Sequence, residues 1–271
     1  MAHTWNAEDY ASHSAAQFDW AVELIAKLSL RGDEAVLDLG CGDGKIDARL
    51  AALLPHGRVV GLDSSSAMID LATARYPAAQ HPNLAFVRMD VRTIRLPARF
   101  EIAFSNAALH WADDHEAILR GVRSCLVPGG RILFQMGGRG NAADVFAAVE
   151  AVVRRPGWRG YFDNLALPWS FYGPEDYGTW LPRQGFHAER VELFPRDMHF
   201  AEADAFRGWL RTTWFHFTDR LPTHRRDPFL NDVIDAYTAA HPPGADGTIR
   251  VRMVRLEVEA RASAARDQDE P

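Results

Sequence analysis

Short apolar runs alternate with helix-like segments through the first half of this 271-residue chain, and this alternation limits its possible folds more than any other feature. Strands that are joined by helices in this way need right-handed crossovers, which place the strands parallel in one sheet with helices on both faces. The pattern predicts five such strands, at residues 35–39, 58–63, 84–89, 100–105 and 131–135.

The second half of the chain has a different character. We expect a sixth strand at 186–194 and a seventh at 249–260, separated by two helix-like segments at 203–217 and 227–240 that are rich in Trp, Phe, Arg and His. We interpret these segments as a cap over the carboxyl edge of the sheet, where ligands of such folds bind. The predicted fold is a doubly wound, seven-stranded, mostly parallel α/β sheet with a helical cap inserted late in the chain. The predicted parts are an N-terminal lid helix (1–30), an α/β core (31–200), the cap (201–245), and a last strand with a frayed tail (246–271).

Composition argues against several classes of partner. A net charge of -6 is unfavourable for a nucleic-acid ligand. The first ten residues are polar and contain two acids, unlike a signal peptide, and no apolar run is long enough to span a bilayer. Two cysteines without CxxC spacing predict no zinc site. We expect a cytoplasmic protein, a monomer or homodimer, with no nucleic-acid, membrane or metal partner.

A glycine-rich loop follows the first strand, with the spacing Asp38-x-Gly40-x-Gly42-x-Gly44. A strand, a glycine turn and a helix start form a site where the backbone approaches a ligand closely. A dinucleotide fingerprint would need glycine at Lys45, and no Walker loop occurs in the chain. An acid at the strand end instead suits a ligand that carries an ammonium group.

Acids also close the next two predicted strands. Asp63 is placed to accept both hydroxyls of a ribose, Met68 to pack on an adenine face, and Asp90 to accept from an exocyclic amine. For any one acid the alternative is a helix cap or a solvated loop. Acids at the ends of three successive strands favour one shared ligand.

In combination these features resemble the class I S-adenosylmethionine-dependent methyltransferases, whose spacing is matched by segments 36–44, 61–69, 104–111 and 126–130. The resemblance covers about residues 30–137. It implies S-adenosylmethionine as cofactor and S-adenosylhomocysteine as product, with the first acid and the glycines at the methionyl part, the second acid at the ribose and the third near the adenine. The implied cofactor contacts are Asp38, Gly40, Gly42, Asp63, Ser64, Met68, Asp90, Val91 and Asn106.

Within that family the chain looks most like the trans-aconitate methyltransferases, which form esters on small polycarboxylates. The start, Trp5-Asn6-x-x-x-Tyr10, and the segment 106–111 carry this likeness. The stretch from His13 to Gln17 also looks like the lid of related carboxyl methyltransferases. It implies cofactor contacts from Tyr10, His13 and Gln17, and the alternative for His13 and Gln17 is a polar helix face.

The acceptor half departs from the aconitate pattern. His216 falls where that family has a basic residue, and Trp214 stands where small residues are usual. These departures count against a tricarboxylate and leave a carboxylate acceptor open. The many aromatic residues of this half indicate either core packing or an aromatic acceptor pocket.

A carboxylate makes modest demands on an enzyme, because it is ionised at neutral pH and needs no strong base. Catalysis would then consist of aligning oxygen, methyl and sulfur and of desolvating the nucleophile. Arg255, with Arg211 as a second candidate, is placed to orient such an acceptor by a bidentate pair. The alternative for each is a surface arginine.

Other hypotheses stay open. A carbon, nitrogen or phenol acceptor would need a general base, with His110, His216 and Tyr172 as candidates, although a structural role is the alternative for His110. The protein could instead bind the cofactor without transferring its methyl. His110 and His115 fall on different helix faces, so we expect no metal site there. The sequence therefore predicts a small-molecule methyltransferase, with a carboxylate oxygen as the leading acceptor.

Overall fold

The structure is a computed structural model that describes residues 15–264. The chain forms two compact units. Of the described residues, the first unit comprises 15–139, 170–193 and 256–264, and the second comprises 140–169 and 194–255. The four-part division expected from the sequence stays a prediction.

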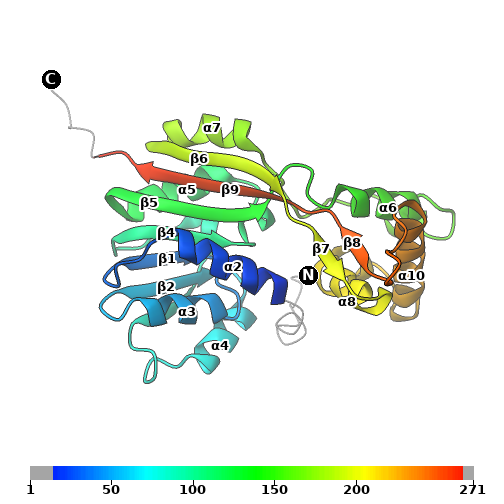
Figure 1. Ribbon diagram of the computed structural model, residues 1–271, viewed down its shortest axis with the longest axis horizontal. Helices are drawn as coiled ribbons and strands as arrows, with labels where there is room; N and C mark the ends of the chain where they lie inside the picture. The colour runs from blue at the N-terminus through cyan, green and yellow to red at the C-terminus, as the bar shows by residue number, and fades with distance from the viewer. Residues whose placement is uncertain (1–14, 265–271) are drawn as a thin grey trace. The chain divides into compact units, whose positions relative to one another are not determined.

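A seven-stranded sheet forms the centre of the first unit (Figure 1). The pairs β1–β2, β2–β3, β1–β4 and β4–β5 are all parallel, which confirms the predicted doubly wound sheet. The first four strands begin at the predicted residues. In spatial order the strands are β3 (Leu84–Arg88), β2 (Arg58–Asp63), β1 (Ala35–Leu39), β4 (Phe100–Asn106), β5 (Leu126–Gly137), β9 (Val254–Ala262) and β6 (Phe186–Pro195).

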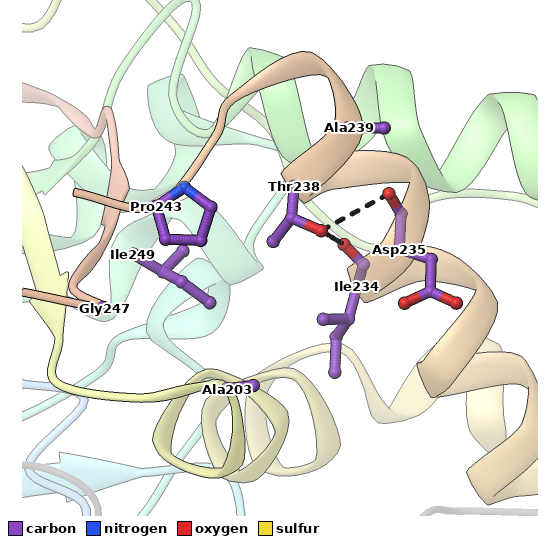
Figure 2. A pocket seen from close by; sticks show the side chains of 8 residues that line it. All are labelled: Ala203, Ile234, Asp235, Thr238, Ala239, Pro243, Gly247 and Ile249. Carbon is purple, nitrogen blue, oxygen red and sulfur yellow. Dashed lines mark hydrogen bonds between the residues drawn. The ribbon is translucent and has the colours of Figure 1, made fainter. Parts of the chain in front are cut away.

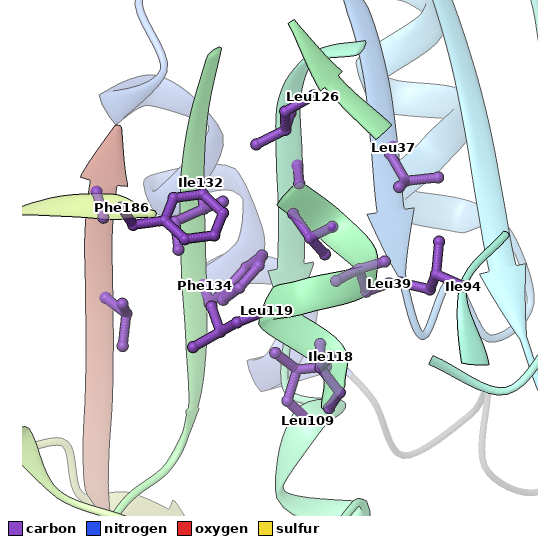
Figure 3. Packing of buried hydrophobic residues seen from close by; sticks show 14 of the residues in the cluster. Leu37, Leu39, Ile94, Leu109, Ile118, Leu119, Leu126, Ile132, Phe134 and Phe186 are labelled. Carbon is purple, nitrogen blue, oxygen red and sulfur yellow. The ribbon is translucent and has the colours of Figure 1, made fainter. Parts of the chain in front are cut away.

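Helices pack on both faces of this sheet, because alternate strand residues point to opposite sides. Leu37 and Leu39 of β1 join a buried cluster with residues of α5 and α7, part of which is shown in Figure 3. Val36 belongs to a second cluster with residues of α2 and α3. The helices and short 3-10 turns of this unit are α2 (Ala15–Lys27), α3 (Lys45–Leu53), α4 (Ser66–Arg75), η1 (Val91–Thr93), η2 (Leu109–Trp111), α5 (His115–Cys125) and α7 (Pro174–Arg183).

Strand β5 begins five residues earlier than the sequence predicts. The turn-like Pro128-Gly129-Gly130 lies inside the strand, where the register with β4 shifts between Phe100 and Ile102. Gly129 has a φ of 74°, a left-handed conformation that glycine adopts without strain. The glycines therefore form a bulge within the strand rather than ending the pairing.

The second unit is mainly helical, and two predictions for it were wrong. The single last strand at 249–260 is two strands, of which β8 (Ile249–Val251) pairs antiparallel with β7 (Met198–Phe200) in a separate sheet. The predicted helix 203–217 is also two, α8 (Ala203–Thr213) and α9 (Phe215–Thr218), because the chain leaves helical geometry at Trp214. The remaining elements are α6 (Ala143–Val153), η3 (Arg159–Tyr161) and α10 (Thr223–Ala240).

A buried carboxylate ties four elements of the first unit together. Glu257 of β9 is 0% exposed. It accepts hydrogen bonds from Lys27 of α2 at 2.7 and 2.9 Å and from Gln135 of β5 at 3.0 Å, and it forms an ion pair with Arg190 of β6. Burial alone would raise the pKa of Glu257, but these donors outweigh burial and leave the pKa below its ordinary value. The ionised form is thus the stable one in the folded protein.

We expect Glu257→Gln to lower the free energy of unfolding by about 1–3 kcal/mol at pH 7, because charged donors lose a carboxylate acceptor. A depressed pKa stabilises the fold above the unfolded-state pKa, so the difference should shrink as the pH falls below about 4.3. Urea denaturation at several pH values measures it. As a control, Glu150→Gln removes an exposed pair with Arg154 and should cost less than about 0.5 kcal/mol. Equal small effects would show that the Glu257 cluster does not stabilise the unit.

Candidate functional site

The loop after β1 is joined to the end of β2 by backbone hydrogen bonds. The N–H groups of Gly40 and Cys41 both donate to the carbonyl of Leu62, at 2.7 and 2.9 Å. Asp38 of β1 lies opposite Gly61 of β2 in the parallel register. The predicted residues at these two strand ends are therefore brought together at one edge of the sheet.

Two glycines of the loop have left-handed backbone, and they differ in the space around them. Gly40 has a φ of 83°, and a Cβ built there would lie 2.1 Å from the Cβ of Ala108, beyond β4. Gly42 has a φ of 54°, but a Cβ there would meet nothing within 4 Å. Gly40 thus allows close packing of two loops, whereas Gly42 borders open space.

Asp63 closes β2 and holds the same loop through its side chain. Its Oδ2 accepts the N–H of Gly42 at 3.0 Å, and its Oδ1 accepts the N–H of Ser65 at 2.8 Å. Burial raises the pKa of Asp63, and the backbone donors offset part of that rise. Each carboxylate oxygen has a second lone pair, so the group can also accept from a diol.

Asp38 is 2% exposed and adjoins a second buried acid, Asp47 of α3, which is 0% exposed. Burial is the main cause that raises the pKa of Asp38 to about 7. Its Oδ1 receives no hydrogen bond from an N–H or hydroxyl group of the described chain. A buried acceptor of this kind fits the ammonium group of a methionyl cofactor.

Asp47 is a residue that the sequence prediction missed. Leu53 of this helix is 38% exposed although it is apolar, whereas the buried positions are Asp47, Leu50 and Ala51. Its spacing indicates burial, because Asp47 stands three residues before Leu50 and seven before Leu54, both of which are buried on the same helix face.

The residues expected near an adenine follow β2 and β3. Met68 is buried in α4, and its N–H donates to the side chain of the N-cap Ser65. Ser64 is exposed, and its carbonyl accepts a hydrogen bond from Nε of Arg88. The Asp90 carboxylate forms an ion pair with Arg92 at 2.7 Å, and the pairing lowers its pKa. Val91 is half-buried beside it. The adenine role of Asp90 stays a prediction, and Arg92 competes for its carboxylate.

The segment after β4 carries local strain. Asn106 is buried at the strand end, and the next residue, Ala107, has a φ of 56° although it is not glycine. Its N–H donates to the carbonyl of Gln135 on β5 at 2.8 Å. Strain of this kind persists where surrounding structure imposes it and is frequent at functional sites.

His110 lies in η2, a few residues further on. Its Nδ1 accepts the N–H of Gly137 at 3.4 Å, and its carbonyl accepts the N–H of Ser170 at 2.9 Å. The ring lies 5.6 Å from that of Trp111 and 6.0 Å from that of Phe171. An accepting Nδ1 assigns the proton of the neutral ring to Nε2.

His115 has a structural environment. Its ring nitrogens bond to the hydroxyl of Tyr177 at 2.7 Å and to the carbonyl of Leu109 at 3.0 Å. Burial lowers its pKa to about 4, so the ring is neutral at physiological pH. Within residues 15–264, no group of three or more His, Cys, Asp or Glu side chains is arranged to hold a metal ion.

The candidate acceptor residues lie in the second unit. His216 of α9 has its ring 5.7 Å from that of Trp169 and 4.0 Å from that of Phe215. Trp214 is buried, and Arg255 is 3% exposed. The roles of His216 and Arg255 stay predictions. Tyr10 and His13 lie outside the described residues, and of Gln17 only its place in α2 is described.

A pocket of about 510 Å³ opens within the second unit (Figure 2). It lies beside Ile234, Thr238 and Ile249, and the Thr238 hydroxyl already donates to the carbonyl of Ile234 at 2.9 Å. No predicted site residue lines it.

Comparison with known proteins agrees with this geometry. Residues 36–130 match a family model described as a methyltransferase domain. A phosphoethanolamine N-methyltransferase from Haemonchus contortus, solved with S-adenosylhomocysteine, shares the fold with a TM-score of 0.59 over 95% of this chain and 57% of its own, at 14% identity. The matched family model and the shared fold thus define a class I methyltransferase that uses S-adenosylmethionine.

Two relatives identify the family. A trans-aconitate 2-methyltransferase from Methylobacterium radiotolerans is 30% identical over 96% of this chain and 99% of its own. Another, from Paracidovorax citrulli, is 31% identical over 97% and 100%. The chain belongs to the methyltransferase family of which these enzymes are members. Among residues 15–264, no helix has the length and apolarity that crossing a membrane requires.

We expect Gly40→Ala to lower the free energy of unfolding by about 1–3 kcal/mol, because a left-handed alanine would also collide with Ala108. The displaced loop should bind S-adenosylhomocysteine at least about tenfold more weakly in calorimetry. Gly178→Ala is the control, since a Cβ there meets nothing within 4 Å in helix α7; it should stabilise slightly. Wild-type behaviour of Gly40→Ala in both assays would contradict the close-packing argument.

Asp63→Ala should weaken S-adenosylhomocysteine binding by about 1–3 kcal/mol, because two ribose hydrogen bonds are lost. Asp63→Asn keeps one acceptor oxygen and should fall between this variant and the wild type. Asp70→Ala, which changes an exposed acid of α4, serves as the control in the same titrations. Unchanged affinity in Asp63→Ala would remove Asp63 from the cofactor site.

Proposed function

We propose that this methyltransferase transfers the methyl group of S-adenosylmethionine to a carboxylate oxygen of a small molecule and so forms a methyl ester. The main support is the extent of the likeness to the trans-aconitate 2-methyltransferases. Their alignments cover almost the whole chain, so they include nearly all of the second unit as well as the cofactor half.

The first unit supplies the groups that would hold the cofactor, which when bound provides an electrophilic methyl on a positively charged sulfur. Asp38 offers a buried acceptor for the ammonium group, and Asp63 offers carboxylate oxygens to the ribose. The open space beside Gly42 lets the backbone approach the ligand closely. These contacts would hold the methyl group in position without taking part in bond making.

The reaction needs no strong general base, because the acceptor carboxylate is already ionised at neutral pH. Its rate then depends on the alignment of nucleophile, methyl and leaving group, and on removal of water from the nucleophile. In the second unit, Arg255 is the proposed partner of the acceptor carboxylate, by a bidentate pair. The aromatic side chains around Trp169 and Trp214, whose rings lie 5.1 Å apart, favour an acceptor with an apolar part.

A base-dependent reaction on carbon, nitrogen or a phenol is the second candidate, with His110 as base. The hydrogen bond from Gly137 to Nδ1 weighs against it, since Nε2 then carries the proton and cannot accept another. Binding without methyl transfer is the third. A cytoplasmic location and a monomeric or homodimeric state remain parts of the proposal that rest on the sequence.

Mass spectrometry with methyl-deuterated S-adenosylmethionine tests the proposal. The acceptor panel should contain di- and tricarboxylates, aromatic acids, fatty acids, phenols and amines. We expect a labelled ester from a carboxylate, and alkaline hydrolysis should release the label as methanol. A label that resists hydrolysis would favour the base-dependent alternative, and no product despite tight cofactor binding would favour a binding protein.

Arg255→Gln should raise the KM for the preferred carboxylate by about 10- to 100-fold, the loss expected for a charge-assisted bidentate pair. The affinity for S-adenosylhomocysteine should stay within about threefold. Arg250→Gln removes an exposed arginine that pairs with Asp197 and is the matched control. Parallel losses of acceptor and cofactor binding in Arg255→Gln would place Arg255 outside the acceptor site.

A further inference from the structure

Asp38 and Asp47 form a pair of carboxyl groups for which residues 15–264 supply no ion-pair partner. Both are almost completely buried. Neither oxygen of Asp47 receives a hydrogen bond from an N–H or hydroxyl group of the described chain, and neither does Oδ1 of Asp38. Gly61 lies opposite Asp38 in the β1–β2 register and directly beside Oδ1 of Asp47, so the two carboxyl groups are neighbours. A hydrogen bond between two carboxyl groups requires a proton on one of them.

The backbone makes room for this pair at Gly61. This residue faces Asp38 across the β1–β2 register, and a Cβ built on it would lie 2.4 Å from Oδ1 of Asp47. Asp47 is the third residue of α3, so the helix start directs its side chain toward β2. Any side chain at position 61 would displace the Asp47 carboxyl from the strand residue that adjoins Asp38.

The surroundings of the pair are mainly acidic. Burial and the neighbouring Asp38 raise the pKa of Asp47 well above its ordinary value. Two buried carboxylates without a cation would repel each other strongly, so one must hold a proton. The nearby titratable groups are Cys41, Asp43, Asp63 and Tyr76, with Lys45 at the start of α3 and Arg75 paired with Asp43 at 2.5 Å.

We propose that Asp47 is a positioning residue: it keeps its proton and donates a hydrogen bond to Asp38, so that Asp38 meets the cofactor's ammonium group as a single, oriented negative charge. The inference rests on the assignment of Asp38 to that ammonium group. Below neutral pH both acids carry a proton in the free protein. Binding of the cation then releases the proton of Asp38 to solvent, and Asp47 retains its own.

Calorimetry on the wild-type protein counts these protons. S-adenosylhomocysteine is the probe, titrated at about pH 6 in buffers of different ionisation enthalpy. Its ammonium group is already protonated at this pH. We expect a release of close to one proton per ligand, and an affinity that rises with pH until about 7, where the pKa of Asp38 lies. Release of two protons, or of none, would overturn the inference.

Two substitutions separate a proton donor from a space-filling residue. Asp47→Asn still donates an N–H but cannot ionise, so it should bind within about threefold of the wild type and keep the pH midpoint. Asp47→Leu has similar size but no donor, so it should bind about tenfold or more weakly, with a higher midpoint because the Asp38 carboxylate loses a hydrogen bond. Asp70→Asn controls for removal of an acid from the neighbourhood.

Either of two results would contradict the role of Asp47. A sharply lower midpoint in Asp47→Asn would mean that Asp47 is ionised in the wild type, and an unchanged midpoint in Asp47→Leu would mean that it does not act on Asp38. If Asp47→Leu does not fold, Asp47→Asn and the wild-type proton count decide. Asp38→Asn tests the underlying assignment separately: wild-type binding by that variant would remove Asp38 from the cofactor site.

Discussion

The site depends on hydrogen bonds that join the glycine loop to the end of β2. Gly40 and Cys41 donate to Leu62, and Gly42 donates to the Asp63 side chain. These bonds hold two strand-end acids at the same sheet edge, and they bend the loop through left-handed backbone that brings Gly40 against Ala108. One short stretch of backbone therefore sets the positions of the β1 acid, the β2 acid and the segment after β4 together.

Much of this arrangement could be predicted because its elements repeat one pattern. The first four strands are short apolar runs, and each of the first three ends at or just before a glycine or an acid, so their type and starting residues follow from the sequence. The second unit offers no such pattern. The break between β8 and β9, at residues 252–253, has no turn signal. Position 214, where α8 ends, is a tryptophan, which does not indicate the end of a helix.

The buried acids were harder to predict for a different reason. An acid in a strand or helix normally predicts an exposed position, because burying an ionised group is costly. Asp47 and Glu257 are both fully buried. Glu257 is stabilised by partners from distant parts of the chain, whereas Asp47 lies beside another acid, Asp38 of the preceding strand. The donors to Glu257 include Lys27, one of only two lysines in the chain. Sequence spacing cannot reveal such neighbours. The acids at the strand ends could be predicted from their positions alone.

Burying an ionised carboxylate is costly, and Glu257 and the Asp38–Asp47 pair avoid this cost in opposite ways. Glu257 meets charged donors, its pKa falls below the ordinary value, and its charge is already balanced in the folded protein. Asp38 and Asp47 meet no charged donor from the described part of the chain, and burial drives their pKa values upward. The first arrangement can stabilise the sheet but has little attraction left for a ligand. The second leaves a buried acid whose ionisation becomes favourable when a cation arrives, which makes the loop receptive to a ligand that carries a positive charge.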